Sequence, residues 1–160
     1  MAQGDNRPVD LAETIVRTCR SVLLIDWPSE EVPNTLVRVG LDVHVKGGPG
    51  PDDFAIRELT DGSITTSRTG RRPGQVDLLY VHRPIDELPR IVAASQGMHV
   101  TALWYQSGLD SDGTNDPRGC WLPAAKSKRA RAIAEAAGLL YVDDRYIADA
   151  ALQHATRPPA

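Results

Sequence analysis

The sequence is short of the features that mark secreted, membrane-bound and metal-binding proteins. Its 160 residues contain two cysteines, Cys19 and Cys120, far apart in the chain. Neither a disulfide framework nor a cysteine metal site is therefore expected. The chain has no run of about 18 apolar residues, and its first ten residues lack the apolar stretch of a signal peptide. We expect a reducing setting and a soluble, cytoplasmic protein.

The chain also lacks a strong excess of charge of either sign. The chain carries 18 Lys and Arg residues against 21 Asp and Glu residues, a formal net charge of −3. This balance argues against a general nucleic-acid or membrane-surface partner, both of which select strongly basic surfaces. A small, nucleotide-like molecule is the expected partner. The sequence leaves the oligomeric state open, with a homodimer as one candidate.

The motifs of several enzyme classes are missing as well. Neither G-x-S-x-G nor H-E-x-x-H occurs in the chain. Asp143 and Asp144 are adjacent in sequence, so in a strand they would point to opposite faces and would not form a paired-carboxylate site. No nucleophile with a base and an orienting group is visible. These absences favour a protein without catalytic residues, with an enzyme acting through His82 as a further hypothesis.

What the chain does contain is a regular alternation of short apolar strands and amphipathic helices. Strands are expected at residues 21–26, 41–46, 76–82, 99–105 and 139–143. Such alternation with compact spacing predicts parallel strands joined by crossover helices. We predict an α/β fold, a three-layer doubly wound sheet of about five strands. One domain would span residues 8–154, between disordered tails at 1–7 and 155–160.

Residues 54–75 do not fit this alternation clearly. The sequence Thr60-Asp61-Gly62 is a turn signal, and the four residues after it favour a short strand. Arg68, Arg71 and Arg72 follow in an insert that either reaches an anion or forms a solvated surface.

Polar and aromatic side chains gather after the predicted strands, where ligands of open parallel sheets bind. The residues proposed to contact a ligand at this rim, or on the helix after the first strand, are Asp26, Trp27, Pro28, Ser29, Asn34, Lys46, His82, Arg83, Gln106, Gly108 and Asp144. The crevice they border is our candidate binding site. No metal site is expected among them.

The turn after the first strand departs from the usual phosphate-binding loop. That loop is rich in glycine, yet no glycine occurs between Ser21 and Val39. An ionised Asp26 about 5 Å from a phosphate would cost roughly 3 kcal/mol at an effective dielectric of 20. Asp26 is either an anchor for a different ligand or a cap on the following helix, and the cap is favoured. Ser29 and Asn34 are likewise phosphate donors or helix caps.

Four other rim residues have specific expected roles. A cation at Lys46 would favour a phosphorylated ribose, and its alternative is an exposed lysine. His82 and Arg83 are the best candidates for ligand contact because a histidine and an arginine follow the same strand. Gln106 is able to read an amide or a base edge. Trp27 either stacks on a base or covers the helix.

Four fragments together carry a family resemblance. They are "SVLLIDWPSEEVPNTLVRVGLDVHV", "VDLLYVHRPIDELPRIV", "TALWYQSGL" and "AAGLLYVDDRY". In this order and spacing, from about residue 9 to 150, the chain resembles the CoA-binding domain family, small Rossmann-like proteins related to the nucleotide-binding domain of succinyl-CoA synthetase. The resemblance implies a Rossmann-like fold and CoA as a cofactor. It also implies a W-x-Q-x-G motif at Trp104, Gln106 and Gly108, and an acidic site residue at Asp143 or Asp144.

The sequence departs from that family at its phosphate loop, which looks degenerate. Asp26 stands where members have a glycine, and Lys46-Gly47-Gly48 stands where they have Asn-Pro. The cysteine common after the fifth strand is missing from residues 143–146. Two functions follow. One is a non-catalytic protein that holds CoA or another adenine nucleotide, its pyrophosphate over the helix starting near Val32. The other is a scaffold that has lost the cofactor and acts through protein–protein contacts.

Overall fold

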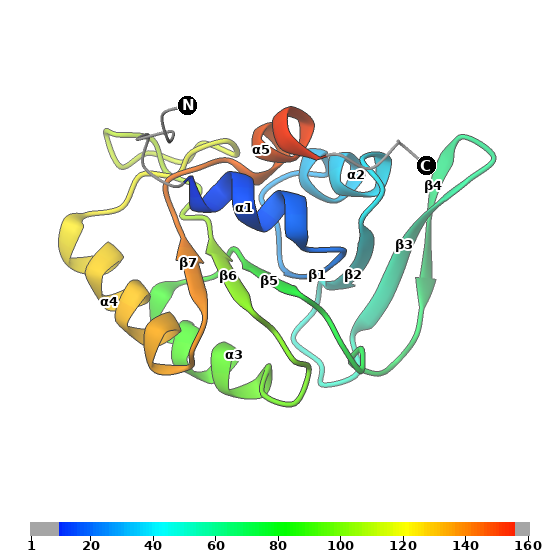
Figure 1. Ribbon diagram of the computed structural model, residues 1–160, viewed down its shortest axis with the longest axis horizontal. Helices are drawn as coiled ribbons and strands as arrows, with labels where there is room; N and C mark the ends of the chain where they lie inside the picture. Colours follow the sequence, from blue (N-terminus) through cyan, green and yellow to red (C-terminus); the bar gives the residue numbers. More distant parts are fainter. Residues whose placement is uncertain (1–9, 156–160) are drawn as a thin grey trace, which may run out of the picture.

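One mixed sheet of seven strands, in the order β4-β3-β2-β1-β5-β6-β7, organises the protein (Figure 1). The structure is a computed structural model and describes residues 10–155. Its strands are β1 (Ser21–Ile25), β2 (Asp42–Lys46), β3 (Phe54–Thr60), β4 (Ser63–Arg68), β5 (Leu78–Val81), β6 (Ala102–Tyr105) and β7 (Leu140–Val142). Its helices are α1 (Leu11–Thr18), α2 (Glu31–Arg38), the 3₁₀ turn η1 (Ile85–Glu87), α3 (Leu88–Ala94), α4 (Ala124–Ala136) and α5 (Ile147–His154).

The five parallel strands confirm the predicted doubly wound core. Strand β1 pairs in parallel with β2 and β5, and the parallel pairing continues through β6 to β7. The prediction was incomplete at residues 54–68, where β3 and β4 form a hairpin that extends the sheet antiparallel to β2. Asp61 and Gly62 connect the hairpin with φ of 51° and 82°. Two left-handed residues in a two-residue loop fit the tight turn that β-hairpins favour.

Alternation along the central strands divides the core into two layers. In β1, Val22 and Leu24 join the layer formed with α1, α2 and α5, whereas Leu23 joins the layer formed with α3 and α4. In β6, Trp104 faces the first layer and is fully buried, as expected of a core residue. Because side chains alternate across a strand, each face of the sheet is buried independently. The helices thus cover both faces and complete the three-layer architecture (Figure 1).

The two faces are not covered equally. Helices α3 and α4 pack on each other, and α4 also packs on β6 and β7. On the same face, the ends of β1 and β2 are bordered by the loop 47–52 and by Arg71 and Arg72 instead. This difference in covering leaves room for a cavity beside α3.

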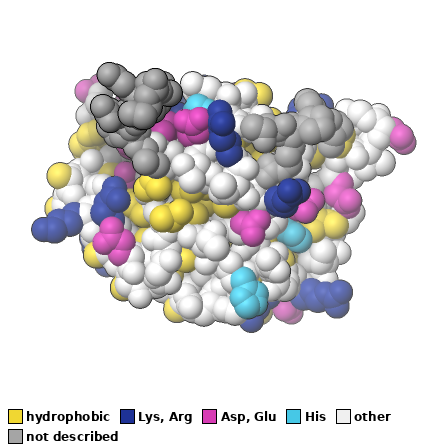
Figure 2. All heavy atoms as spheres, viewed as in Figure 1, with side chains coloured by type: hydrophobic (Ala, Val, Ile, Leu, Met, Phe, Trp, Pro, Cys, Tyr) yellow, Lys and Arg dark blue, Asp and Glu magenta, His cyan; other side chains and the backbone are white. Residues whose placement is uncertain are grey.

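Residues 10–155 also define the character of the exterior. No helix within residues 10–155 is long and apolar enough to cross a membrane. On the face shown in Figure 2, basic and acidic side chains are interspersed without a large patch of one sign. The predicted tails, 1–7 and 155–160, lie outside the described residues except for Ala155.

Candidate functional site

A cavity of about 1090 Å³ lies at the carboxyl ends of β1 and β2. Its apolar walls come from the sheet and from the facing side of α3. They are formed by Leu23, Ile25, Phe54, Ile91, Ala94 and Met98. Ligand sites of proteins are commonly concave and mostly apolar, with a few polar groups that orient the ligand. The volume and lining therefore suit a ligand of nucleotide size.

Charged side chains border this apolar space. The cations are Lys46, Arg71, Arg72, Arg83 and Arg90, and the acids are Asp26, Asp52 and Glu87. The lining thus carries an excess of two positive charges, although the whole chain is negative. A concave site with one sign of charge concentrates ligands of the opposite sign. The cavity is electrostatically suited to an anion.

Asp26 occupies the turn after β1 with a left-handed backbone, φ 62°. Its Oδ1 accepts a hydrogen bond from the Trp27 N–H at 2.8 Å, and its Oδ2 lies 3.2 Å from Nη1 of Arg83. The prediction that Asp26 caps the following helix is wrong. Helix α2 starts five residues later, with Glu30 at its N-cap position and no side-chain hydrogen bond there. The carboxylate borders the cavity instead.

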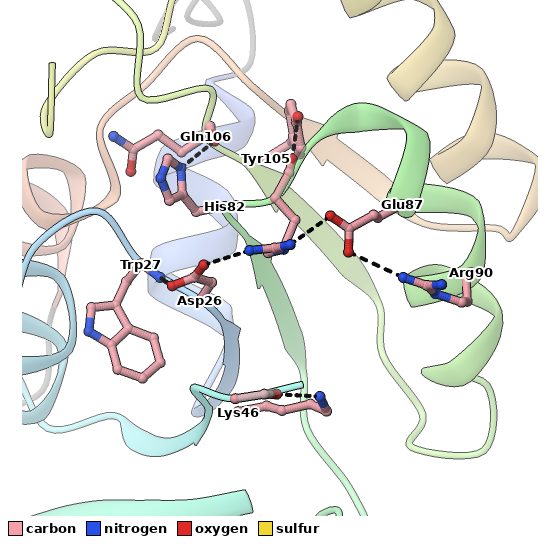
Figure 3. Close-up of polar contacts among 10 residues, drawn as sticks. Asp26, Trp27, Lys46, His82, Glu87, Arg90, Tyr105 and Gln106 are labelled. Carbon is pink, nitrogen blue, oxygen red and sulfur yellow. Dashed lines mark hydrogen bonds and ion pairs between the residues drawn. The ribbon is translucent and has the colours of Figure 1, made fainter. Parts of the chain in front are cut away.

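An alternating row of charges runs from Asp26 along one side of the cavity (Figure 3). Arg83 bridges Asp26 and Glu87, and its Nη2 lies 2.8 Å from Glu87 Oε2. Glu87 also accepts from Arg90 at 3.2 Å. Hydrogen bonds to Glu87 and to Asp26 raise the pKa of Arg83, so it stays charged at every physiological pH. The four charges of this row cancel.

Tyr105 fixes the backbone at Arg83, the central cation of this row. Its hydroxyl donates to the Arg83 carbonyl at 2.6 Å (Figure 3). Burial raises the pKa of Tyr105 to about 12, which keeps the hydroxyl protonated and able to donate. The start of the Arg83 side chain is thereby anchored to β6.

Two other cations of the lining have no carboxylate partner in the contacts of the described residues. Lys46 donates to the Gly48 carbonyl at 2.8 Å, and Arg72 donates to the Ala94 and Gln96 carbonyls at 3.1 and 3.3 Å. Arg72 thus caps the carboxyl end of α3, where a cation is favourable. Carbonyl partners position these groups without cancelling their charge.

Trp27 packs beneath the loop that follows β2. A Cβ on Gly47 would lie 3.0 Å from the Trp27 ring, and the Arg57 guanidinium sits 5.3 Å from the ring centroid. The indole N–H donates to Glu30 at 3.3 Å. The ring therefore contacts the protein on more than one side, and the absence of a side chain at Gly47 is what permits its approach.

The residues predicted on the α2 side do not border the cavity. Pro28, Ser29 and Asn34 are partly buried around the first turn of α2. The Ser29 carbonyl accepts from Val32 N–H at 3.3 Å, and the Asn34 N–H donates to the Glu30 carbonyl at 3.1 Å. Contact of these three residues with a ligand stays a prediction.

Gln106 and its neighbours hold the loop after β6. Gln106 is buried, and its amide nitrogen donates to the Pro117 and Gly119 carbonyls at 2.9 and 3.1 Å. Its amide oxygen accepts from the Tyr80 hydroxyl, whose pKa is raised well above its usual range by burial. The side chain expected to read a ligand thus has three partners within the protein.

His82 also contacts the loop after β6. Its Nδ1 lies 3.0 Å from the Gln106 carbonyl, which is an acceptor only, so Nδ1 carries the proton. The ring rests against Gly108, whose φ is 72° and where a Cβ would fall 2.5 Å from the ring. Neither residue borders the large cavity.

The acidic pair after β7 lies elsewhere. Asp144 borders a separate space of about 230 Å³ with Asp10, Arg131 and Arg145. Asp143 is buried and accepts hydrogen bonds from Ser127 and Tyr141. Both residues lie beyond the end of β7, and they have separate surroundings.

Of the eleven predicted contacts, Asp26, Lys46 and Arg83 border the large cavity. The structure adds Asp52, Glu87 and Arg90 to its charged rim, and Arg71 and Arg72 reach it from the insert. A local signal for Glu87 was present, because it lies four residues after Arg83 and three before Arg90. Those spacings place side chains together on a helical turn.

Comparisons with known proteins bear on the family and the fold of the chain. The profile of the CoA binding domain family matches residues 25–148. The crystal structure of Prb, the PH1109 protein redesigned for binding, matches with a TM-score of 0.54 at 15% identity, covering 89% of this chain and 88% of that chain. A protein of unknown function from Methanothermobacter thermautotrophicus matches with a TM-score of 0.41 at 13% identity, covering 66% of this chain and 77% of that chain. A search of curated proteins found no match.

Proposed function

Because the chain belongs to the CoA binding domain family, we propose that it is a non-catalytic protein that holds CoA or another adenine nucleotide in the cavity beside α3. The observation that carries the proposal is the cavity of about 1090 Å³ with apolar walls and an excess of cationic side chains. The anionic groups of the ligand would meet Lys46, Arg71 and Arg72. Its less polar parts would lie against the apolar walls.

The lining favours binding over covalent chemistry. Among the residues that border the cavity there is no cysteine, histidine, threonine or tyrosine. The hydroxyl of Ser95 donates to the Val92 carbonyl at 2.6 Å and has no imidazole base among the cavity-lining residues. A serine hydroxyl acts as a nucleophile only with a general base within hydrogen-bond reach. What these residues offer is charge, shape and apolar surface.

Calorimetric titration with CoA, supported by thermal unfolding, tests the proposal. We expect saturable binding by the wild type and about a tenfold weaker dissociation constant for Lys46→Ala, the loss of roughly 1.4 kcal/mol. Lys128→Ala is the matched control, because Lys128 is an exposed lysine on α4 that does not border the cavity. The control should bind as the wild type does. ADP, ATP, NAD, NADP and acetyl-CoA distinguish the part of the ligand that is recognised.

Two results would contradict the proposal. If no member of this panel binds at millimolar concentration, the alternative of a scaffold acting through protein–protein contacts takes its place. If CoA binds and Lys46→Ala binds as tightly as Lys128→Ala, the ligand lies outside this cavity.

A further inference from the structure

The turn after β1 has no spare backbone donor at its start. The Asp26 N–H donates to the Lys46 carbonyl at 3.2 Å, and the Trp27 N–H donates to the Asp26 carboxylate at 2.8 Å. Pro28, the next residue, has no N–H group. In a glycine-rich loop these are the groups that approach a phosphate. Here they are already used.

The nearest guanidinium, that of Arg83, is already paired with two carboxylates. Arg83 donates from Nη1 to Asp26 at 3.2 Å and from Nη2 to Glu87 at 2.8 Å. The two carboxylates therefore receive both terminal nitrogens of Arg83, and Tyr105 holds the backbone of Arg83 in place. Arg83 keeps N–H groups that these two bonds do not use, but a phosphate that approaches them also meets the negative charges of Asp26 and Glu87.

The Asp26 carboxylate thus accepts one backbone N–H and one guanidinium N–H. These are the two kinds of donor that bind phosphate oxygens in proteins. We propose that Asp26 is an internal anion that occupies the phosphate-binding donors of the β1 turn and so determines where an anionic ligand binds. This inference rests on the proposed function.

Aspartate is one of the few residues that tolerate the left-handed backbone at this position. At φ 62° most side chains are disfavoured, while glycine, asparagine and aspartate are tolerated. Asp26 therefore keeps the backbone conformation that glycine readily adopts and adds a negative charge to it. A neutral ligand oxygen, such as a hydroxyl donor, fits beside this carboxylate better than a phosphate does.

The phosphates of the ligand are then directed to Lys46, Arg71 and Arg72. Among the described residues, Lys46 and Arg72 bond to carbonyl oxygens, so their charges remain available. Asp52 also borders the cavity and reduces the local excess, but Lys46, Arg71 and Arg72 together outweigh its charge. The row of Asp26, Arg83, Glu87 and Arg90 is neutral by comparison.

Asp26→Asn tests the inference directly. Asparagine keeps an oxygen for the Trp27 N–H and tolerates the left-handed backbone, while it removes the charge that holds Arg83. Calorimetric titrations with CoA and with inorganic pyrophosphate compare wild type, Asp26→Asn and Asp26→Asn/Arg83→Gln. Glu58→Gln, at an exposed position on β3, changes the net charge by the same unit away from the cavity.

We expect Asp26→Asn to bind both probes at least tenfold more tightly, and the added Arg83→Gln to abolish that gain. Glu58→Gln should bind as the wild type does. An unchanged affinity in Asp26→Asn, a gain that survives Arg83→Gln, or an equal gain in Glu58→Gln would each overturn the inference. Binding by the wild type with no gain in Asp26→Asn leaves the proposed function standing. If Asp26→Asn binds CoA and the wild type does not, the inference is supported and the proposal that the wild type binds CoA is contradicted.

Discussion

The loop after β6 and the turn after β1 both carry polar side chains at the carboxyl edge of one sheet, yet they use them differently. Gln106 is buried, and both ends of its amide are bonded to protein partners. Asp26 and Arg83 remain about two-fifths exposed beside a cavity. The first set of contacts fixes the path of the chain, and the second leaves charge within reach of solvent and ligand.

This difference shows that polarity at a strand end is not sufficient evidence for a binding residue. What separates the two regions is whether the protein already satisfies each donor and acceptor. A buried polar group with all its partners contributes to stability, because losing one partner leaves another group unsatisfied. We therefore expect substitutions in the β6 loop to change stability and those at the β1 turn to change affinity.

Among the variants that test this difference, Gln106→Ala is expected to have the largest effect on stability. The change leaves the Tyr80 hydroxyl and the Pro117 carbonyl without their partner, while the Gly119 carbonyl keeps its hydrogen bond from the Gly108 N–H. We expect a loss of about 3 kcal/mol in the free energy of unfolding, measured by urea denaturation. CoA affinity of the folded fraction should stay within about twofold of the wild type. Gln153→Ala, at an exposed position on α5, is the control and should be neutral.

Thiol labelling gives the same variant a second readout. Cys120 lies in this loop, and burial raises the pKa of its thiol to about 12. Wild-type Cys120 should therefore label slowly at pH 8, and Gln106→Ala should label faster as the loop opens. An unchanged labelling rate together with unchanged stability would show that Gln106 does not hold the loop.

Gly108→Ala is expected to have the next largest effect. A Cβ there meets a left-handed φ of 72° and lies 2.5 Å from the His82 ring. We expect a loss of about 2 kcal/mol in stability. Gly62→Ala is the matched control, since its φ is 82° but nothing lies within 4 Å of the added carbon. It should cost only about 1 kcal/mol, the backbone part alone. Equal losses in the two variants would contradict the contact with His82.

Arg83→Ala should show the opposite behaviour to Gln106→Ala. It leaves the Asp26 carboxylate without its guanidinium partner at the cavity. CoA affinity should fall about tenfold, because an unpaired negative charge then faces the anionic ligand. The free energy of unfolding should change by less than about 1 kcal/mol, since the ion pair is largely exposed. A large stability loss without an affinity change would place Arg83 with Gln106 rather than with the ligand.

Arg90→Gln should have the smallest effect. Arg90 is 77% exposed and its described partner is Glu87. Exposed ion pairs contribute little to stability. We therefore expect the CoA affinity to change by less than about twofold and the free energy of unfolding by less than about 0.5 kcal/mol. Titration and urea denaturation check both values. A tenfold loss of affinity would extend the ligand contact along α3.

Much of the fold could be predicted because the parallel strands are continuous apolar runs. Val22, Leu23 and Leu24 are all buried, because helices cover both faces of the sheet. A short uninterrupted apolar run is typical of such a parallel strand. The β3–β4 hairpin was harder, because Arg57 and Glu58 interrupt its apolar residues. The Asp61-Gly62 turn was nevertheless a usable signal.

The candidate site could be predicted only where it depends on strand ends. Asp26 and Arg83 follow strands and Lys46 ends one, and the parallel topology brings the three to one edge. Arg90, Arg71 and Arg72 reach the cavity through the packing of α3 and of the loop after β4, which periodicity does not reveal. The partners of Gln106 depend on the path of residues 107–123, a loop without regular structure.

The left-handed backbone at Asp26 also has a consequence for how this site changes over generations. Codons for aspartate differ by a single base from codons for asparagine and for glycine. All three residues tolerate a positive φ at this position. One mutation therefore removes the charge while preserving the turn that carries it. The ligand preference of the turn is consequently free to vary under selection, with little demand on the rest of the chain.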